Sequence, residues 1–334
     1  MGVIVDVPMV DLSMNESPFP PIPAVLEAVR SAAERMRQYA DFRAADVVTA
    51  LAKQLDVPEG ELALGPGSAG LTQLVIQALD PSRTEIVHPA LSFEGYPLMA
   101  ANLHNRSVPV PLAGLAHDLD AMAAAVTEQT RCVLLCNPNN PTGAALTHAE
   151  ITEFLTRIPS DVVVIIDEAY REFAAAEDYA DGLVLHREHD NVCVVRTFSK
   201  AYGLASLRIG YAVLPARIAV PVQMAGLLFH PGGLAQAAAL ACLDPEVQQE
   251  CARRSAELRN TRDRLRADLV AAGLAVPTSE TNFLWLPLGS GSEEFAARCR
   301  AAGFLVRCFP DVGVRVTVGD EEANSRVLAV AGAW

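Results

Sequence analysis

The sequence has no block of basic residues and no long apolar run. Its 334 residues include 40 acidic and 26 basic side chains, which gives a formal net charge of −14. Without a cluster of basic side chains the chain has no surface that would bind a phosphodiester backbone, so we expect no nucleic acid partner. No apolar run approaches the roughly 18 residues that a membrane span needs, and the start, MGVIVDVPMVDL, has no basic segment. We therefore expect neither a targeting signal nor a membrane anchor.

The cysteines lack any metal-binding pattern. The chain has seven, with no CxxC pair and no companion histidine at zinc spacing. Scattered cysteines of this kind are typical of reduced thiols in a cytoplasmic protein. We accordingly predict a cytoplasmic location and no metal site.

Hydrophobic residues make up 51% of the chain, enough for a large core. Apolar residues recur at helical spacing over residues 24–36 and about 46–55. Helices then alternate with short runs, several of them apolar throughout, as expected for strands that are covered on both faces. These runs occupy residues 61–65, 84–89, 106–112, 130–138, 161–170 and 191–199. The alternation predicts an α/β fold with a mostly parallel sheet.

The pattern changes beyond about Leu234, where long charged helices precede three further strand-like runs at 282–288, 304–309 and 313–319. We interpret this part as a small α+β domain. The predicted organisation is an N-terminal arm with the first helix (1–44, packing with the small domain or a partner subunit), a large domain (45–233) and a C-terminal small domain (234–334).

Polar residues gather where three of the predicted strands end, in segments 136–143, 165–170 and 196–211. An α/β sheet binds its ligand outside the carboxyl ends of its strands. Lys200 follows a strand among small and hydroxyl residues, a setting in which burial and nearby cations lower the pKa of an amine toward use as a nucleophile. Asp167 closes an apolar run, and a carboxylate there can keep a pyridine nitrogen protonated.

Other side chains in these segments suit the rest of such a ring. Tyr170 and Asn140 are placed to donate to a phenolate oxygen. Arg208 lies eight positions after the lysine and, with Ser199 and Thr197, can pair with a phosphate.

Two competing interpretations have less support. GPGSAG (65–70) satisfies the GxGxxG pattern of dinucleotide-binding proteins, but that pattern needs an acidic residue at the end of the next strand, and Glu85 opens its strand instead. A nicotinamide-dependent dehydrogenase is therefore a distant alternative. Glu16 and Glu168 suggest a two-carboxylate hydrolase, yet no spacing rule links them.

Taken in order, these segments resemble the fold-type-I aminotransferases, and among them the histidinol-phosphate aminotransferase branch. The matching segments are NESP in the arm, the glycine turn, NPNNPTG, DEAY, TFSKAYGLASLRIGY, NFLW and VRVTVG, and they cover nearly the whole chain. The resemblance implies a large domain and a small domain of the type-I fold, pyridoxal 5'-phosphate as cofactor, and an amino donor and a keto acceptor as substrates.

The resemblance also assigns roles to individual residues around the cofactor. Lys200 would carry the cofactor as a Schiff base and move the proton, and Asp167 would bind the pyridinium nitrogen. The remaining cofactor contacts would be Asn140 and Tyr170 to the phenolate oxygen, Thr197, Ser199 and Arg208 to the phosphate, the amides of Ser68, Ala69 and Gly70 to the same phosphate, and Phe93 stacked on the ring.

Substrate and subunit contacts follow from the same resemblance. Arg315 would bind the anionic group of the substrate. Arg307, Phe19 and Asn15 would be further substrate contacts. Tyr39 would reach the cofactor phosphate of a neighbouring subunit, which implies a homodimer with shared active sites.

The reaction and the substrate stay open at this point. Phe19 has no hydroxyl for a substrate phosphate where family members typically show a tyrosine, so an α-amino carboxylate is the simplest anionic amino substrate. The same scaffold supports decarboxylation, as in threonine-phosphate decarboxylase, and β- or γ-replacement on a hydroxylated amino acid. A transcriptional regulator built on an aminotransferase body is disfavoured, because the enzyme-like arm already begins at Asn15 and leaves no room for a DNA-binding domain.

Overall fold

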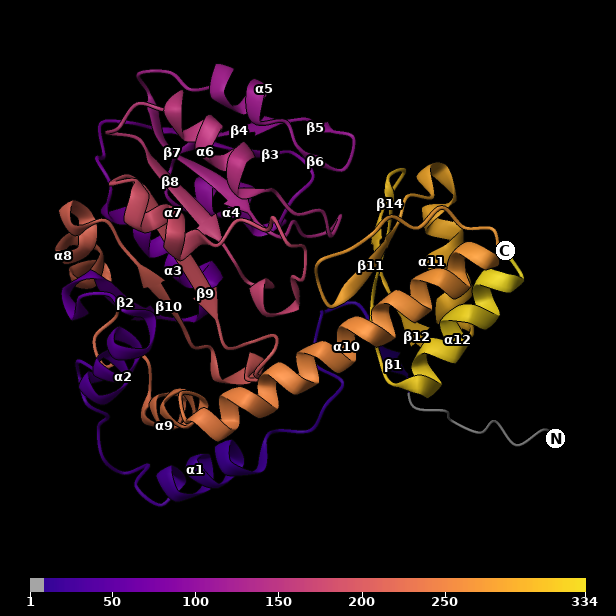
Figure 1. The fold of residues 1–334 in the computed structure, drawn as a ribbon, viewed down its shortest axis with the longest axis horizontal. Helices are drawn as coiled ribbons and strands as arrows, with labels where there is room; N and C mark the ends of the chain where they lie inside the picture. The colour runs from indigo at the N-terminus through magenta and orange to yellow at the C-terminus, as the bar shows by residue number, and fades with distance from the viewer. Residues whose placement is uncertain (1–8) are drawn as a thin grey trace.

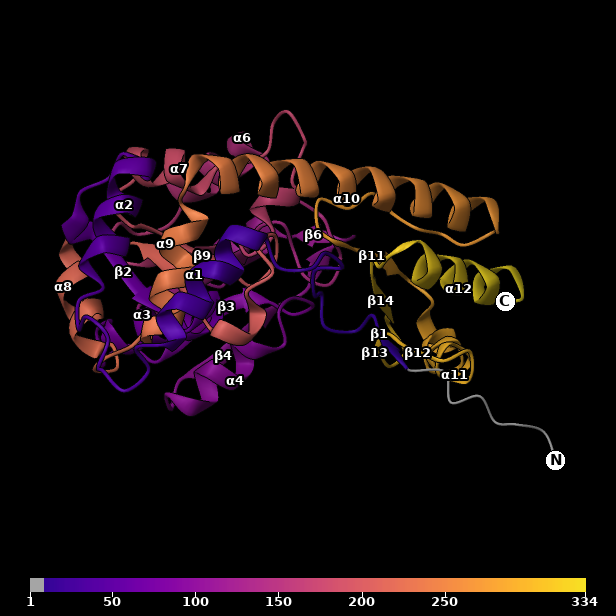
Figure 2. The same ribbon diagram turned by 90° about the horizontal axis from the view of Figure 1, so that it is seen from below.

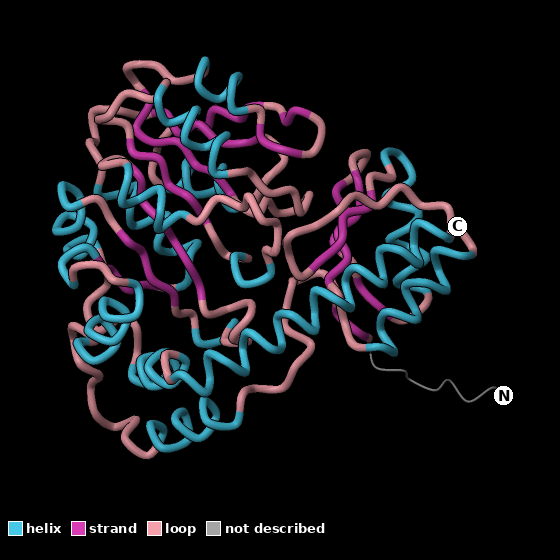
Figure 3. Tube along the Cα trace, in the orientation of Figure 1, coloured by secondary structure: helices cyan, strands magenta, loops and turns pink. Residues whose placement is uncertain are grey.

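The computed structural model describes residues 9–334, which form a larger and a smaller lobe (Figure 1). A tube coloured by secondary structure shows that each lobe has its own sheet with helices packed around it (Figure 3). This confirms the α/β prediction.

The larger lobe contains a seven-stranded sheet with strand order β2-β10-β9-β8-β7-β3-β4. In that order the strands are β2 (Leu62–Gly65), β10 (Gly210–Val213), β9 (Val192–Thr197), β8 (Val163–Asp167), β7 (Thr130–Cys136), β3 (Glu85–Pro89) and β4 (Arg106–Val110). β10 runs antiparallel to both of its neighbours, and the other neighbouring strands of this sheet are parallel. Each of the six predicted runs contains one of these strands, whereas β10 was not predicted because it lies within the polar segment around Lys200.

Helices cover both faces of this sheet, because successive residues of each buried strand point to opposite faces. Val133 and Leu135 of β7 belong to one core, while Leu134 between them belongs to the other. One face carries α3 (Gly67–Ala78), α4 (Gly95–Asn102) and α8 (Ala216–Ala225); the other carries α1 (Pro23–Ala33), α2 (Ala45–Leu55), α5 (Leu119–Ala124), α6 (His148–Thr156), α7 (Gly182–Glu188) and α9 (Gly233–Cys242).

The smaller lobe is built on an antiparallel sheet of order β11-β14-β13. The N-terminal arm joins it, since β1 pairs with β12 in parallel. The bounds are β1 (Val10–Asp11), β11 (Phe283–Leu286), β12 (Phe304–Leu305), β13 (Arg307–Phe309), β14 (Gly313–Thr317), α11 (Ser292–Ala301) and α12 (Glu321–Gly332); a hairpin of β5 (Leu112–Ala113) and β6 (Ala116–His117) extends the larger lobe.

A 27-residue helix, α10 (Pro245–Ala271), runs along both lobes (Figure 2). Its first half gives Val247 and Leu258 to the core of the larger lobe, and its second half gives Leu265 and Leu269 to the core of the smaller lobe. Helix α9 also packs into the larger lobe, against α1. We therefore propose that the division between the lobes lies within α10, rather than at residue 233 as the sequence suggested.

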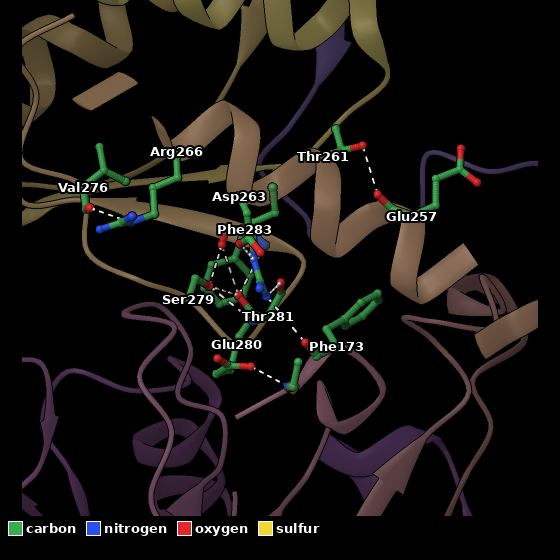
Figure 4. A network of polar contacts seen from close by, with 12 residues as sticks. Phe173, Glu257, Thr261, Asp263, Arg266, Val276, Ser279, Glu280, Thr281 and Phe283 are labelled. Carbon is green, nitrogen blue, oxygen red and sulfur yellow. Dashed lines mark hydrogen bonds and ion pairs between the residues drawn. The ribbon is translucent and has the colours of Figure 1, made fainter. Parts of the chain in front are cut away.

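The connection from α10 to β11 is fixed by polar contacts to both lobes (Figure 4). Arg266 Nε donates to the carbonyl oxygen of Val276 at 3.0 Å, within the smaller lobe. The backbone nitrogen of Ala175, in the larger lobe, donates to Glu280 Oε2 at 2.6 Å. These bonds hold the smaller lobe beside the carboxyl edge of the large sheet.

Within residues 9–334 no helix combines the length and the apolar character of a membrane span. All seven cysteines are free thiols, and six of them are buried.

Candidate active site

The carboxyl ends of β2, β7, β8 and β9 open onto a cavity of about 610 Å³, closed on its far side by the arm and by β13 and β14. Most of the site residues expected from the sequence line this one cavity: Asn15, Ser68, Ala69, Phe93, Asn140, Asp167, Tyr170, Thr197, Ser199, Lys200, Arg208, Arg307 and Arg315. Gly70, Phe19 and Tyr39 do not line it. The structure therefore brings together side chains from segments up to about 300 residues apart in the chain.

Lys200 reaches into the cavity from the turn after β9. Its Nζ donates to the backbone oxygens of Met14 and Asn15, at 3.0 and 3.1 Å. Burial, together with the nearby charges of Arg315 and Arg208, lowers the pKa of this amine to about 8 against the opposing effect of Glu16. Because both acceptors are neutral carbonyls, no contact locks the amine in its charged form. A large fraction is therefore a free nucleophile near pH 8.

Asp167 ends β8 with its carboxylate buried beneath the cavity floor. Burial raises its pKa to about 6, although hydrogen bonds from neighbouring groups oppose the shift. The hydroxyl of Tyr96 donates to Oδ2 at 3.3 Å. The other carboxylate oxygen of Asp167, Oδ1, is buried and has no hydrogen-bond partner among the described residues. A buried acceptor of this kind is costly unless a donor meets it, so this oxygen fits a protonated ring nitrogen.

Glu168, the next residue, points to the opposite face of the strand. It accepts from Arg196 Nε at 2.7 Å and from the Gly182 amide at 2.8 Å, so its charge is fully engaged inside the larger lobe. It does not line the cavity, whereas Glu16 does. The two-carboxylate hydrolase hypothesis is therefore wrong, because the two groups do not face one another.

Arg208, Ser199 and the start of α3 form a cup in the cavity lining, and this combination of groups suits an anion. Arg208 donates from Nη1 to Ser199 Oγ at 3.2 Å and from Nη2 to the Pro66 oxygen at 3.1 Å. Helix α3 begins beside it at Gly67, so free amides and the positive end of the helix dipole face the same space. A Cβ at position 67 would lie 2.8 Å from Arg208 Nη2, and φ there is +75°. Glycine is thus required for the arginine to approach the helix.

Gly70 was expected to contribute its amide to this cup. It lies further along the first turn of α3, where a Cβ would meet the Pro66 ring at 2.3 Å. Ser68 and Ala69 line the cavity and Gly70 does not. The position of Gly70 is explained by close packing of the helix on the turn before it.

Asn140 and Tyr170 line the same cavity and both lie near Arg315. The hydroxyl of Tyr170 accepts from Asn15 Nδ2 at 2.9 Å, and burial raises its pKa well above the usual value. The oxygen of Asn140 accepts from Arg315. This leaves the Tyr170 hydroxyl proton and the Asn140 amide nitrogen free to donate to a phenolate oxygen.

Arg315 extends from β14 into the cavity and forms no ion pair within residues 9–334. Its two terminal nitrogens donate to Asn140 and to the backbone oxygen of Ser13, both of them neutral acceptors. Its Nε is buried without a partner in the described part of the chain, and its guanidinium lies 5.4 Å from the centre of the Phe283 ring. Burial lowers the pKa of this group. Such an arginine is ready to receive a carboxylate.

The predicted aromatic contacts divide between the cavity and the surface. Phe93 lines the cavity and packs edge-on against Tyr96. Phe19 lies outside it, at the edge of the large core, where the Arg254 guanidinium covers its ring at 5.5 Å. Tyr39 is 86% exposed and contacts Phe229 away from the cavity. The local sequence did not show that the proline-rich arm turns Phe19 toward α10.

Several cavity residues were missed by the sequence reasoning. They are Ser13, Met14, Glu94, Cys136, Ala169, Ala205 and Ser206 in the cavity lining, with Tyr96 behind Asp167, and also Glu16, which the sequence suggested only as part of a hydrolase site. Tyr96 had a usable signal, because it follows Phe93 by three positions, and the two rings pack against each other. The arm residues had none, since their contacts depend on how the arm crosses the sheet edge.

Comparison with known proteins agrees with this geometry. The family model for class I and II aminotransferases matches residues 7–330. The chain belongs to this family. The aminotransferase is 45% identical to an aromatic amino acid aminotransferase of Streptomyces avermitilis, over 96% of this chain and 89% of that protein, and 46% identical to one of Thermobifida fusca with the same coverage.

Among solved structures, the aminotransferase resembles a histidinol-phosphate aminotransferase from Sinorhizobium meliloti in complex with pyridoxal 5'-phosphate. The TM-score is 0.89 with 28% sequence identity, covering 97% of this chain and 90% of that one. The predicted family, fold and aminotransferase activity are confirmed.

Proposed function

We propose that this aminotransferase binds pyridoxal 5'-phosphate and transfers the amino group of aromatic α-amino acids. The observation that carries the proposal is the convergence of four groups on one cavity: the Lys200 amine, the unpaired oxygen of Asp167, the cup at Arg208 and the free charge of Arg315. Each group matches a different part of the cofactor and the substrate. The PLP-bound relative of similar fold supports the same cofactor.

The residues of the cavity suit the cofactor at each of its polar positions. Arg208, Ser199 and the start of α3 would hold its phosphate, while Asp167 would keep its ring nitrogen protonated. Asn140 and Tyr170 would donate to its ring oxygen. When bound, the cofactor supplies an electron sink for the bond that breaks at the substrate Cα.

Lys200 is the residue that would move the proton. With the cofactor bound, its Nζ would take the proton from the substrate Cα and return it within the site, which is the proton movement that conversion of an amino acid to a keto acid needs. A base with a pKa of about 8 is well matched to accept and return a proton near neutral pH. Arg315 would hold the substrate carboxylate, fixing Cα beside the amine.

Aromatic donors are favoured by two observations. The relatives that are 45–46% identical are named aromatic amino acid aminotransferases. The lining of the cavity also includes the apolar residues Met14, Ala69, Phe93 and Ala205. Burying a ring against apolar lining stabilises the bound substrate by roughly 2 kcal/mol over alanine.

The substrate proposal is tested with purified enzyme, pyridoxal 5'-phosphate and single amino donors. We expect kcat/KM for L-phenylalanine and L-tyrosine to exceed that for L-alanine by about thirtyfold or more, and conversion of the cofactor to its amine form. A higher kcat/KM for histidinol phosphate would contradict the proposal. Consumption of the amino acid without that conversion would favour decarboxylation or replacement.

We also propose that the enzyme is a homodimer. Large apolar side chains are exposed together: the Phe229 ring contacts both Tyr39 and Phe42, at 4.8 and 5.9 Å between centroids. The preceding residues Leu227 and Leu228 are 68% and 75% exposed. Such a patch is typical of a protein interface, and a second copy would cover it and bring Tyr39 to the partner's site.

Sedimentation equilibrium tests the dimer. We expect twice the 35.6 kDa chain mass at micromolar concentration, and a monomer for the double variant Leu227→Asp, Leu228→Asp, because burying charge in an apolar interface is costly. A monomeric wild-type protein would contradict this proposal.

The thiols support a cytoplasmic location, which we infer for this enzyme. Seven free cysteines, six of them buried, suit a reducing compartment.

A further inference from the structure

Glu94 and Arg307 form an ion pair at the mouth of the cavity, between the two lobes. Arg307 begins β13 in the smaller lobe, and Glu94 directly precedes α4 in the larger one. Arg307 Nε donates to Glu94 Oε2 at 3.0 Å and Nη2 donates to Oε1 at 2.5 Å. Both side chains also line the cavity. The arginine expected to bind substrate is thus already bound to a carboxylate of the protein.

Arg307 lies directly opposite Arg315 in the β13 and β14 pair. Opposed residues point to the same face of a sheet, with Cβ atoms about 5 Å apart, and like charges at such positions repel. Glu94 neutralises the outer arginine of the two, while Arg315 bonds only to neutral acceptors. Outside the cup at Arg208, the cavity therefore presents a substrate with one guanidinium that has no ion-pair partner among the described residues.

The Glu94 carboxylate has no competing task in the fold. Glu94 is the N-cap residue of α4, yet its side chain makes no capping hydrogen bond. The pair is about half exposed, at 47% for Arg307 and 49% for Glu94. Ion pairs with this exposure contribute little to stability, so a second anion on a substrate can displace Glu94 at modest cost.

We propose that Glu94 is a specificity-determining residue that selects against amino substrates with a second anionic group, by holding Arg307 and leaving Arg315 as the one free guanidinium outside the cup at Arg208. The proposal rests on the proposed function, because it assigns the substrate carboxylate to Arg315. It explains how a cavity with two opposed arginines accepts a donor with an uncharged ring.

The test compares two isosteric donors, L-glutamate and L-glutamine, which differ in one charge. In Glu94→Gln the shape is kept and Arg307 is released beside Arg315. We expect the ratio of kcat/KM for L-glutamate to that for L-glutamine to rise about two- to fivefold over wild type. Adding Arg307→Gln should reverse this rise. Glu322→Gln is the matched control, since it breaks a surface ion pair with Arg326 on α12 and should leave the ratio unchanged.

A binding measurement provides a second readout. Calorimetry with glutarate, a dicarboxylate without an amino group, should show tighter binding to Glu94→Gln by a similar factor, while butyrate should show a smaller change. The proposal would be overturned if kcat/KM for L-glutamate and for L-glutamine changed equally in Glu94→Gln, because their ratio would then equal that of wild type. The ion pair would in that case be only a contact between the lobes. Loss of the proposed function is separate: it would appear as wild-type enzyme inactive on L-phenylalanine, whatever glutarate does.

Discussion

Lys200→Ala lowers the rate of amino transfer from L-phenylalanine by about a thousandfold or more in our account. The variant loses the nucleophile and the proton carrier together, and general acid–base catalysis alone is commonly worth about 10²–10⁴-fold. The amine is not replaced by a neighbour, because the chain has one other lysine, Lys53, exposed on α2. Single-turnover kinetics with saturating cofactor measure the effect.

Lys53→Ala is the matched control for this variant and should retain wild-type kinetics. In wild type the free amine of Lys200 increases as the pH rises through about 8, so the proton-transfer rate should rise with pH over that range. A Lys200→Ala enzyme within tenfold of wild type would remove Lys200 from the chemistry and require another base.

The isosteric substitution Asp167→Asn should lower kcat by about 10²–10³-fold while the protein remains folded. The amide cannot keep the ring nitrogen protonated, and loss of one well-placed electrostatic partner has this typical cost. We expect weaker cofactor binding as well, measured by titration of the visible absorption band of the bound cofactor.

The effect on stability should have the opposite sign. Burial raises the folded-state pKa of Asp167 to about 6, so the cofactor-free protein loses stability as the pH rises from the unfolded pKa through 6. An amide removes this penalty. Thermal unfolding at pH 7 without cofactor should therefore show Asp167→Asn at least as stable as wild type. A variant that melts well below wild type would show a structural role instead, and one with unimpaired kcat would contradict the assigned contact.

The main sheet could be predicted from the sequence because buried parallel strands are apolar on both faces. Several of the six runs stand out for that reason, and three of them end next to a polar segment. Strand β10 was not predicted, because Gly210 and Tyr211 follow directly on the polar residues around Lys200 and the strand is only four residues long. Periodicity likewise could not show which core receives α9, since a helix face of alanines and a cysteine suits either lobe.

The central site residues could be predicted because they follow strand ends, whose positions the fold fixes. Contacts of the arm could not. The backbone N–H of Asn15 donates a hydrogen bond to Thr317 Oγ1, 302 positions away. Asn15 also adopts a positive φ of 55°. Nothing local shows that the arm crosses the cavity there, nor that Phe19 then turns toward Arg254. Glu94 was missed for the same reason, because its partner Arg307 comes from another lobe.

The central claim is that the cofactor is held by the Lys200 amine. It is tested most directly by incubating wild-type protein with pyridoxal 5'-phosphate, reducing with borohydride and locating the added mass by peptide mass spectrometry. The chain has only two lysines, so the result is unambiguous. Our account predicts the phosphopyridoxyl group on the peptide that contains Lys200 and none on the peptide that contains Lys53. Label on Lys53, or no label under conditions that convert L-phenylalanine, would contradict it.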